Sequence, residues 1–254
     1  MISIGSNWYR KIWSLDIKDQ SWVEDTSNQV DFIINALGLQ GGERILDLAC
    51  GFGRHSLEFS RRGYKVVGID ITRDYIEDAK MEAKRNRLSA EFFCSDIRDI
   101  AFENEFDIVL NLADGAIGYL ENDSENLKIF DAVAKALKVG GRHLMDVVNA
   151  DYADTHFPCQ LWDAGEKGLT LSKFEWDKES RIMMYGQMDI LYEIPLYKPA
   201  FEKGCPTRLY NLPELENIMG KRRMHVLHTY SDYYGAPVSS NSIQLMVVSE
   251  KNKL

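Results

Sequence analysis

Two glycines and several acids occupy positions typical of a nucleoside-binding site. Gly51 and Gly53 follow the short apolar run 44–49, and a helix-like segment begins directly after them. Glycines at such a turn let a ligand approach the backbone closely, and the N-terminus of the following helix offers free N–H groups. Asp70 follows the next apolar run, and a carboxylate there can accept hydrogen bonds from both hydroxyls of a ribose. Asp96 ends a third run, within reach of an adenine or another ligand edge.

These residues meet only if the segments between them form a parallel sheet. Apolar runs of strand length alternate with helical segments of about 10 to 15 residues, which is typical of a doubly wound α/β fold. In such a sheet, ligands bind beyond the carboxyl ends of the strands, where the strand order reverses. The expected strands are 44–49, 64–69, 91–94, 106–113 and 142–148, and the expected helices lie around 30–37, directly after 53, at 72–87 and around 124–137.

The pattern changes after Asn149, where strands follow one another without helices between them. Residues 170–176 and 182–194 predict two strands joined by a polar turn, and hence an antiparallel insertion of roughly 50 residues. Asn211 and Glu214 form a capping-box pattern that opens a helix. Two further strands are expected at 225–230 and 242–249.

The chain is therefore expected to divide into four segments. They are an N-terminal helical flap (1–40), a cofactor-binding α/β core (41–150), an antiparallel insertion for substrate selection or dimerisation (151–208), and a C-terminal helix with the final two strands of the core sheet (209–254).

Composition excludes several classes of protein. The 254 residues are 45% apolar and 27% charged, which is typical of a folded globular chain, and the net charge of −9 does not favour binding to nucleic acid. The four scattered cysteines, the lack of a signal-peptide pattern and the lack of a long apolar segment predict a reduced, soluble, cytoplasmic protein without membrane contact. His225 and His228 are three apart in an expected strand, which puts them on opposite faces, so no metal site is expected.

The glycine turn resembles the first motif of the class I S-adenosylmethionine-dependent methyltransferases. A dinucleotide site reads G-x-G-x-x-G, but Ser56 stands at the third glycine here. The methyltransferase motif is acid-x-Gly-x-Gly-x-Gly, and this chain has Asp47-x-Ala49-x-Gly51-x-Gly53, with alanine for the first glycine. The resemblance extends over an ordered set: LDLACGFGRH (46–55), VVGIDIT (66–72), CSDIRDI (94–100), FDIVLNLADGAIGYL (106–120) and LKVGGRHLMDVVN (137–149).

The resemblance implies the fold, the cofactor and its contacts. The fold would be a Rossmann-like, seven-stranded, mostly parallel sheet with an antiparallel last strand, plus the antiparallel insertion after the fifth strand. The cofactor would be S-adenosylmethionine. By resemblance, Ala49, Gly51 and Gly53 would line its methionine part, Asp70 would hold the ribose, Ile71 would pack on the adenine, Asp96 and the Ile97 backbone would meet the adenine amino group, Leu112 would lie beside the sulfonium, and Asp47 would act indirectly.

Aromatic and amide side chains near expected strand ends are candidates for the acceptor site, because loops carry function. These candidates are Tyr9, Tyr119, Asn149, Tyr152, Trp162 and Tyr233, and none is an evident catalytic base. The aromatics between Trp8 and Trp22 have two interpretations. They either pack as a flap on the core or form a lid over the cofactor, with Arg10 meeting its carboxylate.

The sequence therefore predicts an enzyme that moves a methyl group from S-adenosylmethionine to a small-molecule acceptor by in-line displacement. Two alternatives stay open: an NAD(P)-dependent oxidoreductase, and a non-catalytic S-adenosylmethionine-binding protein. A nucleic-acid methyltransferase is disfavoured, since residues 111–114 lack the Pro-Pro-aromatic pattern of amino-directed enzymes. The insertion could equally form a homodimer interface.

Overall fold

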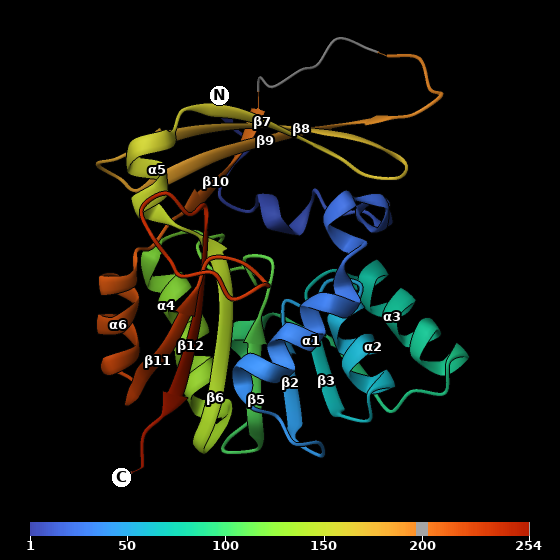
Figure 1. Cartoon of the computed structure of the whole chain (residues 1–254), viewed down its shortest axis with the longest axis vertical. Coiled ribbons are helices and arrows are strands. Elements are labelled where there is room, and N and C mark those ends of the chain that lie inside the picture. Colours follow the sequence, from blue (N-terminus) through green and yellow to red (C-terminus); the bar gives the residue numbers. More distant parts are fainter. Residues whose placement is uncertain (197–202, 254) are drawn as a thin grey trace.

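A seven-stranded sheet forms the centre of the molecule in the computed structural model, which describes residues 1–196 and 203–253 (Figure 1). Its strand order is β11-β12-β6-β5-β2-β3-β4. Only β12 runs antiparallel to its neighbours β6 and β11, which confirms the expected antiparallel last strand. The strands are β2 (Arg44–Leu48), β3 (Lys65–Asp70), β4 (Glu91–Cys94), β5 (Phe106–Asn111), β6 (Leu137–Val148), β11 (Met224–Tyr230) and β12 (Gln244–Lys251).

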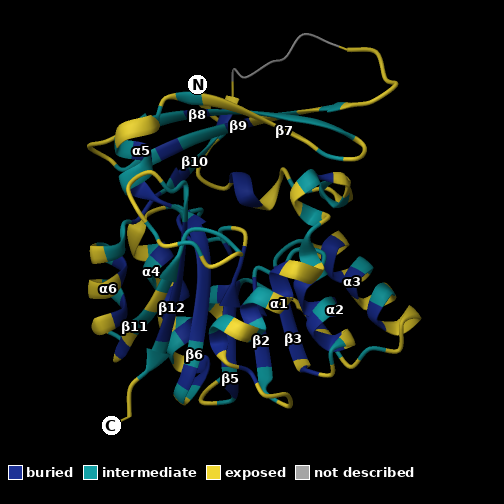
Figure 2. Ribbon diagram, viewed as in Figure 1, coloured by how far each residue is buried: buried dark blue, intermediate teal, exposed yellow. Residues whose placement is uncertain are grey.

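Helices cover both faces of this sheet because successive strand residues point to opposite faces. Ile45 packs in one apolar cluster with Val30 of α1, whereas Leu46 packs in the other with Phe130 of α4. Figure 2 shows the strands as a buried layer between the helices. The helices are α1 (Thr26–Leu37), α2 (Arg54–Arg61), α3 (Arg73–Arg85), α4 (Asp123–Ala136), α5 (Ala150–His156) and α6 (Leu212–Gly220). The doubly wound α/β prediction is confirmed.

A second sheet of five strands lies across the carboxyl ends of the core strands (Figure 1). Its order is β1-β10-β9-β8-β7, and β8 and β9 form the hairpin that the sequence predicted. The strands are β1 (Ile2–Ser3), β7 (Cys159–Ala164), β8 (Gly168–Asp177), β9 (Ile182–Leu191) and β10 (Lys203–Arg208). The sequence did not predict β1, β7, β10 or α5.

The N-terminal residues connect the two sheets. Within the expected flap of residues 1–40, α1 packs against the core sheet, and β1 pairs in parallel with β10. Three short 3-10 helices lie between these elements: η1 (Trp8–Arg10), η2 (Leu15–Asp19) and η3 (Ser21–Val23). The four-segment division of the chain stays a prediction.

A β-bulge overturns the expectation for the two C-terminal histidines. The register of β11 against β12 shifts between Val226 and His228, so that His225 pairs with Glu250 and His228 with Val248. Because the two partners are two residues apart, the histidines share one face of the strand. No group of metal-ligating side chains is found in residues 1–196 and 203–253. Over the same ranges, no helix combines the length and the apolar character needed to cross a membrane.

Candidate active site

A cleft of about 950 Å³ opens at the carboxyl ends of β2, β3 and β5, where the strand order reverses. Eight of the nine predicted cofactor-binding residues line it: Asp47, Ala49, Gly51, Asp70, Ile71, Asp96, Ile97 and Leu112. The parallel strands bring these residues together from four separate stretches of sequence. We call this the cofactor cleft.

Gly53 lies outside the cofactor cleft, contrary to the expected methionine contact. It is the N-cap of α2, with φ of 77°, and a Cβ there would come within 2.7 Å of the Phe92 ring and 3.2 Å of Ala79. The glycine is therefore needed for close packing of α2 on α3 and β4. Gly51 differs, because the nearest side-chain atom to a Cβ there would be Tyr75 at 4.0 Å, so its backbone faces open space.

Asp70 holds the glycine turn against the end of β3. One carboxylate oxygen accepts from the Gly51 N–H at 2.9 Å, and the other accepts from the Thr72 N–H at 2.8 Å. Burial raises the pKa of Asp70, and the backbone donors oppose that shift. Each carboxylate oxygen has a second lone pair, so both can accept one more hydrogen bond.

Asp47 lies beneath the turn and is satisfied by Ser56. The Ser56 hydroxyl, at the position where a dinucleotide motif has its third glycine, donates to Asp47 at 2.6 Å. Burial raises the pKa of Asp47 to about 7. Ala49, in place of the first motif glycine, has φ of 56°, a left-handed conformation that disfavours a side chain.

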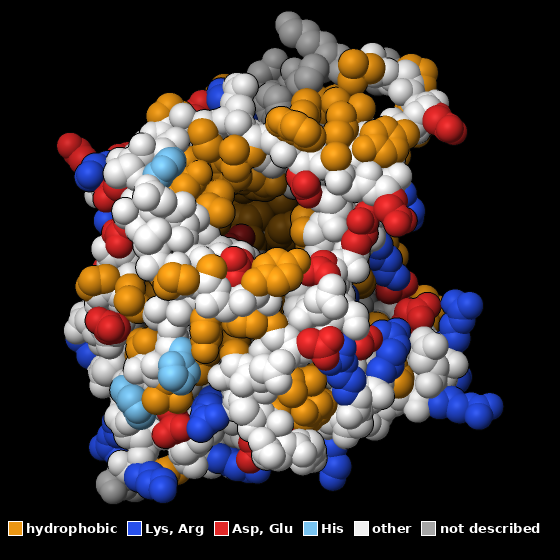
Figure 3. Space-filling model, in the orientation of Figure 1, with side chains coloured by type: hydrophobic (Ala, Val, Ile, Leu, Met, Phe, Trp, Pro, Cys, Tyr) orange, Lys and Arg blue, Asp and Glu red, His pale blue; other side chains and the backbone are white. Residues whose placement is uncertain are grey.

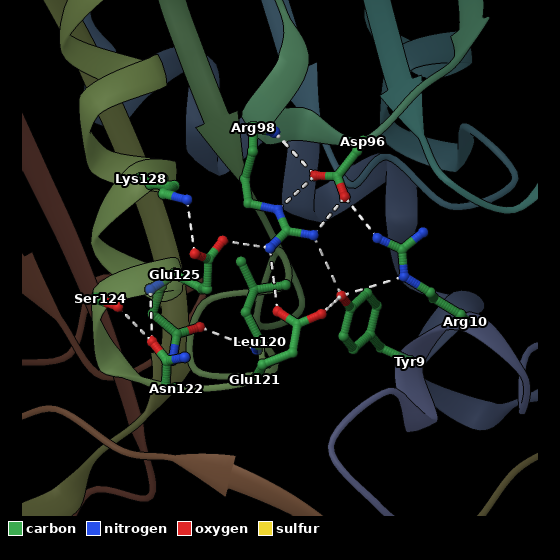
Figure 4. A network of polar contacts seen from close by, with 11 residues as sticks. Tyr9, Arg10, Asp96, Arg98, Leu120, Glu121, Asn122, Ser124, Glu125 and Lys128 are labelled. Carbon is green, nitrogen blue, oxygen red and sulfur yellow. Dashed lines mark hydrogen bonds and ion pairs between the residues drawn. The ribbon is translucent and has the colours of Figure 1, made fainter.

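Asp96 belongs to an ion-pair network that joins the N-terminal residues to the core (Figure 4). Arg98 donates to both of its oxygens, at 2.9 and 2.6 Å, and Arg10 donates at 2.8 Å. Burial alone would raise the pKa of Asp96, but hydrogen bonds from Arg98 and the charge of Arg10 lower it. The Tyr9 hydroxyl donates to Glu121 at 2.7 Å within the same network. Arg10 is therefore bound to Asp96, and the predicted contact of Arg10 with the cofactor carboxylate is not what this geometry favours.

The sequence reasoning missed Arg54, which lines the cofactor cleft at the start of α2. Its guanidinium donates to the neutral oxygens of Thr26 at 2.8 Å and Gln29 at 2.6 Å, and it lies over the Trp22 ring. A cation at this position could have been suspected, because Arg54 directly follows the glycine turn.

A second, larger cavity lies between the two sheets and holds about 2040 Å³ of space open to solvent. Figure 3 shows a hollow with mostly apolar walls in the middle of this face. The wall that it shares with the cofactor cleft consists of Trp13, Ile17, Trp22, Tyr75, Ala113 and Tyr119. We call it the acceptor cavity.

The six predicted acceptor residues separate in the structure. Tyr9 lines the cofactor cleft, and Tyr119 lines both spaces. The other four line neither: Asn149 caps α5, Tyr152 stacks on His156, Trp162 is 73% exposed on β7, and Tyr233 donates to Asp146. The aromatic residues between Trp8 and Trp22 fit both interpretations in part. Trp8 is buried against the core, as expected of a flap, whereas Trp13 and Trp22 line the cofactor cleft, as expected of a lid.

Comparison with known proteins points to methyltransferases. A methyltransferase domain matches residues 45–141. A ubiquinone biosynthesis O-methyltransferase from Bradyrhizobium diazoefficiens is 35% identical over 145 residues, which is 57% of this chain and 55% of that one. A related Geobacillus protein is 27% identical over 64% of this chain, which spans 64% of that protein.

Two solved structures share the fold. An S-adenosylmethionine-dependent methyltransferase from Clostridium acetobutylicum is 18% identical, with a TM-score of 0.75 over 93% of this chain and 97% of that one. A 1,6-didemethyltoxoflavin-N1-methyltransferase from Burkholderia thailandensis, solved with its substrate and S-adenosylhomocysteine, is 14% identical, with a TM-score of 0.58 over 91% and 81%. Residues 45–141 therefore carry a methyltransferase domain, and the chain as a whole has the fold of S-adenosylmethionine-dependent methyltransferases.

Proposed function

We propose that this protein transfers the methyl group of S-adenosylmethionine to a small molecule bound in the acceptor cavity. The observation that carries the proposal is the shared wall. The cofactor cleft and the acceptor cavity meet across Trp13, Tyr75 and Tyr119, at the carboxyl ends of the core strands. Because the acceptor cavity lies between the two sheets, an acceptor bound there would be flanked by both, which favours a small molecule over a nucleic acid.

The residues of the cofactor cleft fit S-adenosylmethionine. Asp70 would accept the ribose hydroxyls with its free lone pairs, and the open backbone at Gly51 leaves room above the turn. Ile71, Ile97 and Leu112 supply apolar surface for the adenine and the sulfonium side. Asp96 would accept from the adenine amino group by sharing an oxygen with an existing donor, since Arg98 and Arg10 already give each of its oxygens two hydrogen bonds. Ala49 would lie along the methionine part, with Asp47 ordering the turn from below.

Arg54 would hold the carboxylate of the methionine part. Its partners Thr26 and Gln29 are neutral, so its charge is free to be met by a ligand. This role replaces the one that the sequence suggested for Arg10.

When bound, the cofactor supplies an electrophilic methyl group on a sulfonium ion. The protein then has to align the acceptor with that methyl group and exclude water, which accounts for much of the rate in such reactions. Trp13, Trp22 and Tyr75 line the cofactor cleft, and aromatic rings favour a nearby cation. Tyr119, which lines both spaces, is placed to orient the acceptor.

Calorimetric titration with S-adenosylmethionine tests the proposal, with NAD as the control ligand. We expect micromolar binding of S-adenosylmethionine and none of NAD, followed by transfer of radiolabelled methyl to members of a small-molecule library. Binding without any transfer would favour a non-catalytic S-adenosylmethionine-binding protein, and binding of NAD alone would overturn the proposal.

A further inference from the structure

Two acids lie side by side in the acceptor cavity, near its shared wall with the cofactor cleft. Asp146 lies on β6 and is only 4% exposed. Asp114 follows β5, and its backbone N–H donates to the Asp146 carbonyl oxygen at 2.8 Å. Both line the acceptor cavity, and Ala113 beside them also lines the cofactor cleft. The pair is thus placed where an acceptor would meet the methyl group.

The turn that presents Asp114 is strained. Residues 113 to 116 all have left-handed backbones, with φ of 50°, 67°, 52° and 62°, although only one of them is a glycine. A left-handed conformation costs a non-glycine residue about 1–2 kcal/mol. Such strain persists only where the surroundings impose it, and it concentrates at functional sites.

Both carboxylates are satisfied in part, and only by neutral donors. Asp114 accepts from the Tyr119 hydroxyl at 2.8 Å, while Asp146 accepts from the Tyr233 hydroxyl at 2.8 Å and the Gln244 amide at 3.0 Å. These side-chain contacts fall on one oxygen of each acid, Oδ2, and the Val148 backbone N–H is a further neutral donor to Asp114. Within the described residues, neither acid forms an ion pair.

No neighbouring cation is hydrogen-bonded to Asp114 or Asp146 within the described residues. Burial raises the pKa of Asp146 to about 7, and the charge of Asp114 adds to that effect. Arg54 acts on Asp146 in the opposite sense, but its hydrogen bonds go to Thr26 and Gln29. Burial likewise raises the pKa of Asp114.

The rest of the acceptor cavity is suited to a cation with an apolar body. Its other charged side chains are Asp16, Asp189 and Lys203, so acids outnumber bases. Its walls include Trp8, Trp13, Trp22, Tyr75, Phe174 and Tyr185, and aromatic faces attract cations. A buried acid pair without a cation of its own is stabilised when a ligand supplies one.

We infer that the acceptor is a primary or secondary amine on an apolar or aromatic body, held as an ammonium ion by Asp114 and Asp146 and methylated on nitrogen. The inference rests on the proposed function and narrows its acceptor to one chemical class. For the transfer, the ammonium gives one proton to a carboxylate of the pair. The nitrogen lone pair then forms the new N–C bond, and the electron pair of the broken S–C bond stays on sulfur. The carboxylic acid returns its proton to solvent, so each transfer releases one proton and leaves a methylated ammonium ion.

Binding of matched amines and alcohols tests the inference without any turnover. The probes are phenethylamine with phenethyl alcohol, tryptamine with tryptophol, and hexylamine with hexanol, each titrated by NMR onto protein saturated with S-adenosylhomocysteine. We expect at least one amine to bind about tenfold more tightly than its alcohol, as a charge-assisted contact would produce. Asp114→Asn and Asp146→Asn should reduce that preference to below about threefold.

Asp74→Asn is the matched control, because Asp74 is an exposed acid on α3 outside both cavities. All variants are first checked for an unchanged circular dichroism spectrum and for binding of S-adenosylhomocysteine. The inference is overturned if no amine binds better than its alcohol, or if the preference survives both asparagine variants. A failure of the proposed function looks different, because the wild-type protein would then fail to bind S-adenosylmethionine and S-adenosylhomocysteine at all.

Discussion

The cofactor cleft and the acceptor cavity balance their charges in different ways. In the cofactor cleft, Asp70 receives two backbone N–H groups, Asp96 is paired with two arginines, and Asp47 accepts from Ser56. In the acceptor cavity, Asp114 and Asp146 have only neutral donors. Asp47 and Asp70 also accept only from neutral groups, so the difference between the two spaces is the pairing of Asp96 with arginines. Within the described residues, neither acid of the acceptor cavity has such a partner, and a cationic ligand could supply one.

The two spaces also differ in how the chain builds them. Apart from four N-terminal aromatic and apolar residues, the cofactor cleft is lined by residues between 47 and 120, at the ends of consecutive strands. The acceptor cavity draws on residues from 4 to 244 and needs both sheets. A cofactor common to a whole class can be served by one compact unit, while the selection of an acceptor depends on how distant segments pack together.

The largest effect on stability is expected where β10 of the five-stranded sheet contacts the turn at Gly118 of the core. Arg208 of β10 donates its N–H to the Gly118 carbonyl oxygen at 2.8 Å, and a Cβ on Gly118 would lie 2.0 Å from the Arg208 carbonyl oxygen. Gly118→Ala should therefore lower the free energy of unfolding by on the order of 3–5 kcal/mol, as measured by urea denaturation.

Gly140→Ala is the control for this prediction. Gly140 has φ of 76°, similar to the 86° of Gly118, but a Cβ there would meet nothing within 4 Å. It should cost only the backbone strain, about 1 kcal/mol. Equal losses in the two variants would mean that the contact between β10 and the turn contributes nothing.

The next effect concerns the uncompensated charge of Asp146. Its folded-state pKa of about 7 lies above the ordinary value of 3.8, so the folded protein holds an extra proton between these values. The free energy of unfolding of the wild type therefore falls as pH rises from about 4 to about 7. Asp146→Asn removes this loss and should be more stable than the wild type by on the order of 3 kcal/mol at pH 8.

The difference between the two proteins should shrink toward pH 4, and thermal or urea unfolding over pH 4–8 measures it. His143, whose burial lowers its pKa to about 3, destabilises both proteins as pH falls below about 6.5, so its effect cancels in the comparison. A constant or inverted difference would show that Asp146 carries no uncompensated charge.

Asp70→Ala should have an effect of comparable size, on the affinity for the cofactor. It removes a charged acceptor and also frees the Gly51 and Thr72 N–H groups. We expect the affinity for S-adenosylmethionine to fall by about 2–3 kcal/mol, roughly 30- to 150-fold, in calorimetric titration. Asp74→Ala, which changes an exposed acid on α3, should bind as the wild type does. Unchanged affinity in Asp70→Ala would remove the ribose assignment.

The same contrast explains what could be predicted from the sequence. The positions of Gly51 and Asp70 follow from short apolar runs and the turns after them, which are local signals. The cavity position of Asp146 could not be predicted in this way, because it depends on the pairing of β6 with β12, about 100 residues later, and on the five-stranded sheet of β1 and β7 to β10. The packing role of Gly53 was missed for a similar reason. Its close neighbour Phe92 lies on a strand 39 positions later in the chain.

The smallest effect is expected at Arg10, in the network that joins the N-terminal residues to the cofactor cleft. The side chain of Arg10 is 41% exposed, and Asp96 keeps its contacts with Arg98 when Arg10 is removed. An exposed pair of this kind contributes about 0.2–1 kcal/mol, so Arg10→Ala should weaken binding of S-adenosylmethionine by roughly two- to fivefold. Calorimetry at about 0.05 and 0.5 M salt should show this loss only at the lower concentration, because salt screens exposed charges.

A loss above tenfold that persists at high salt would mean that Arg10 contacts the cofactor itself. The N-terminal residues would then bind the cofactor directly, and the difference between the two spaces would rest on the pairing of Asp96 with Arg98 alone.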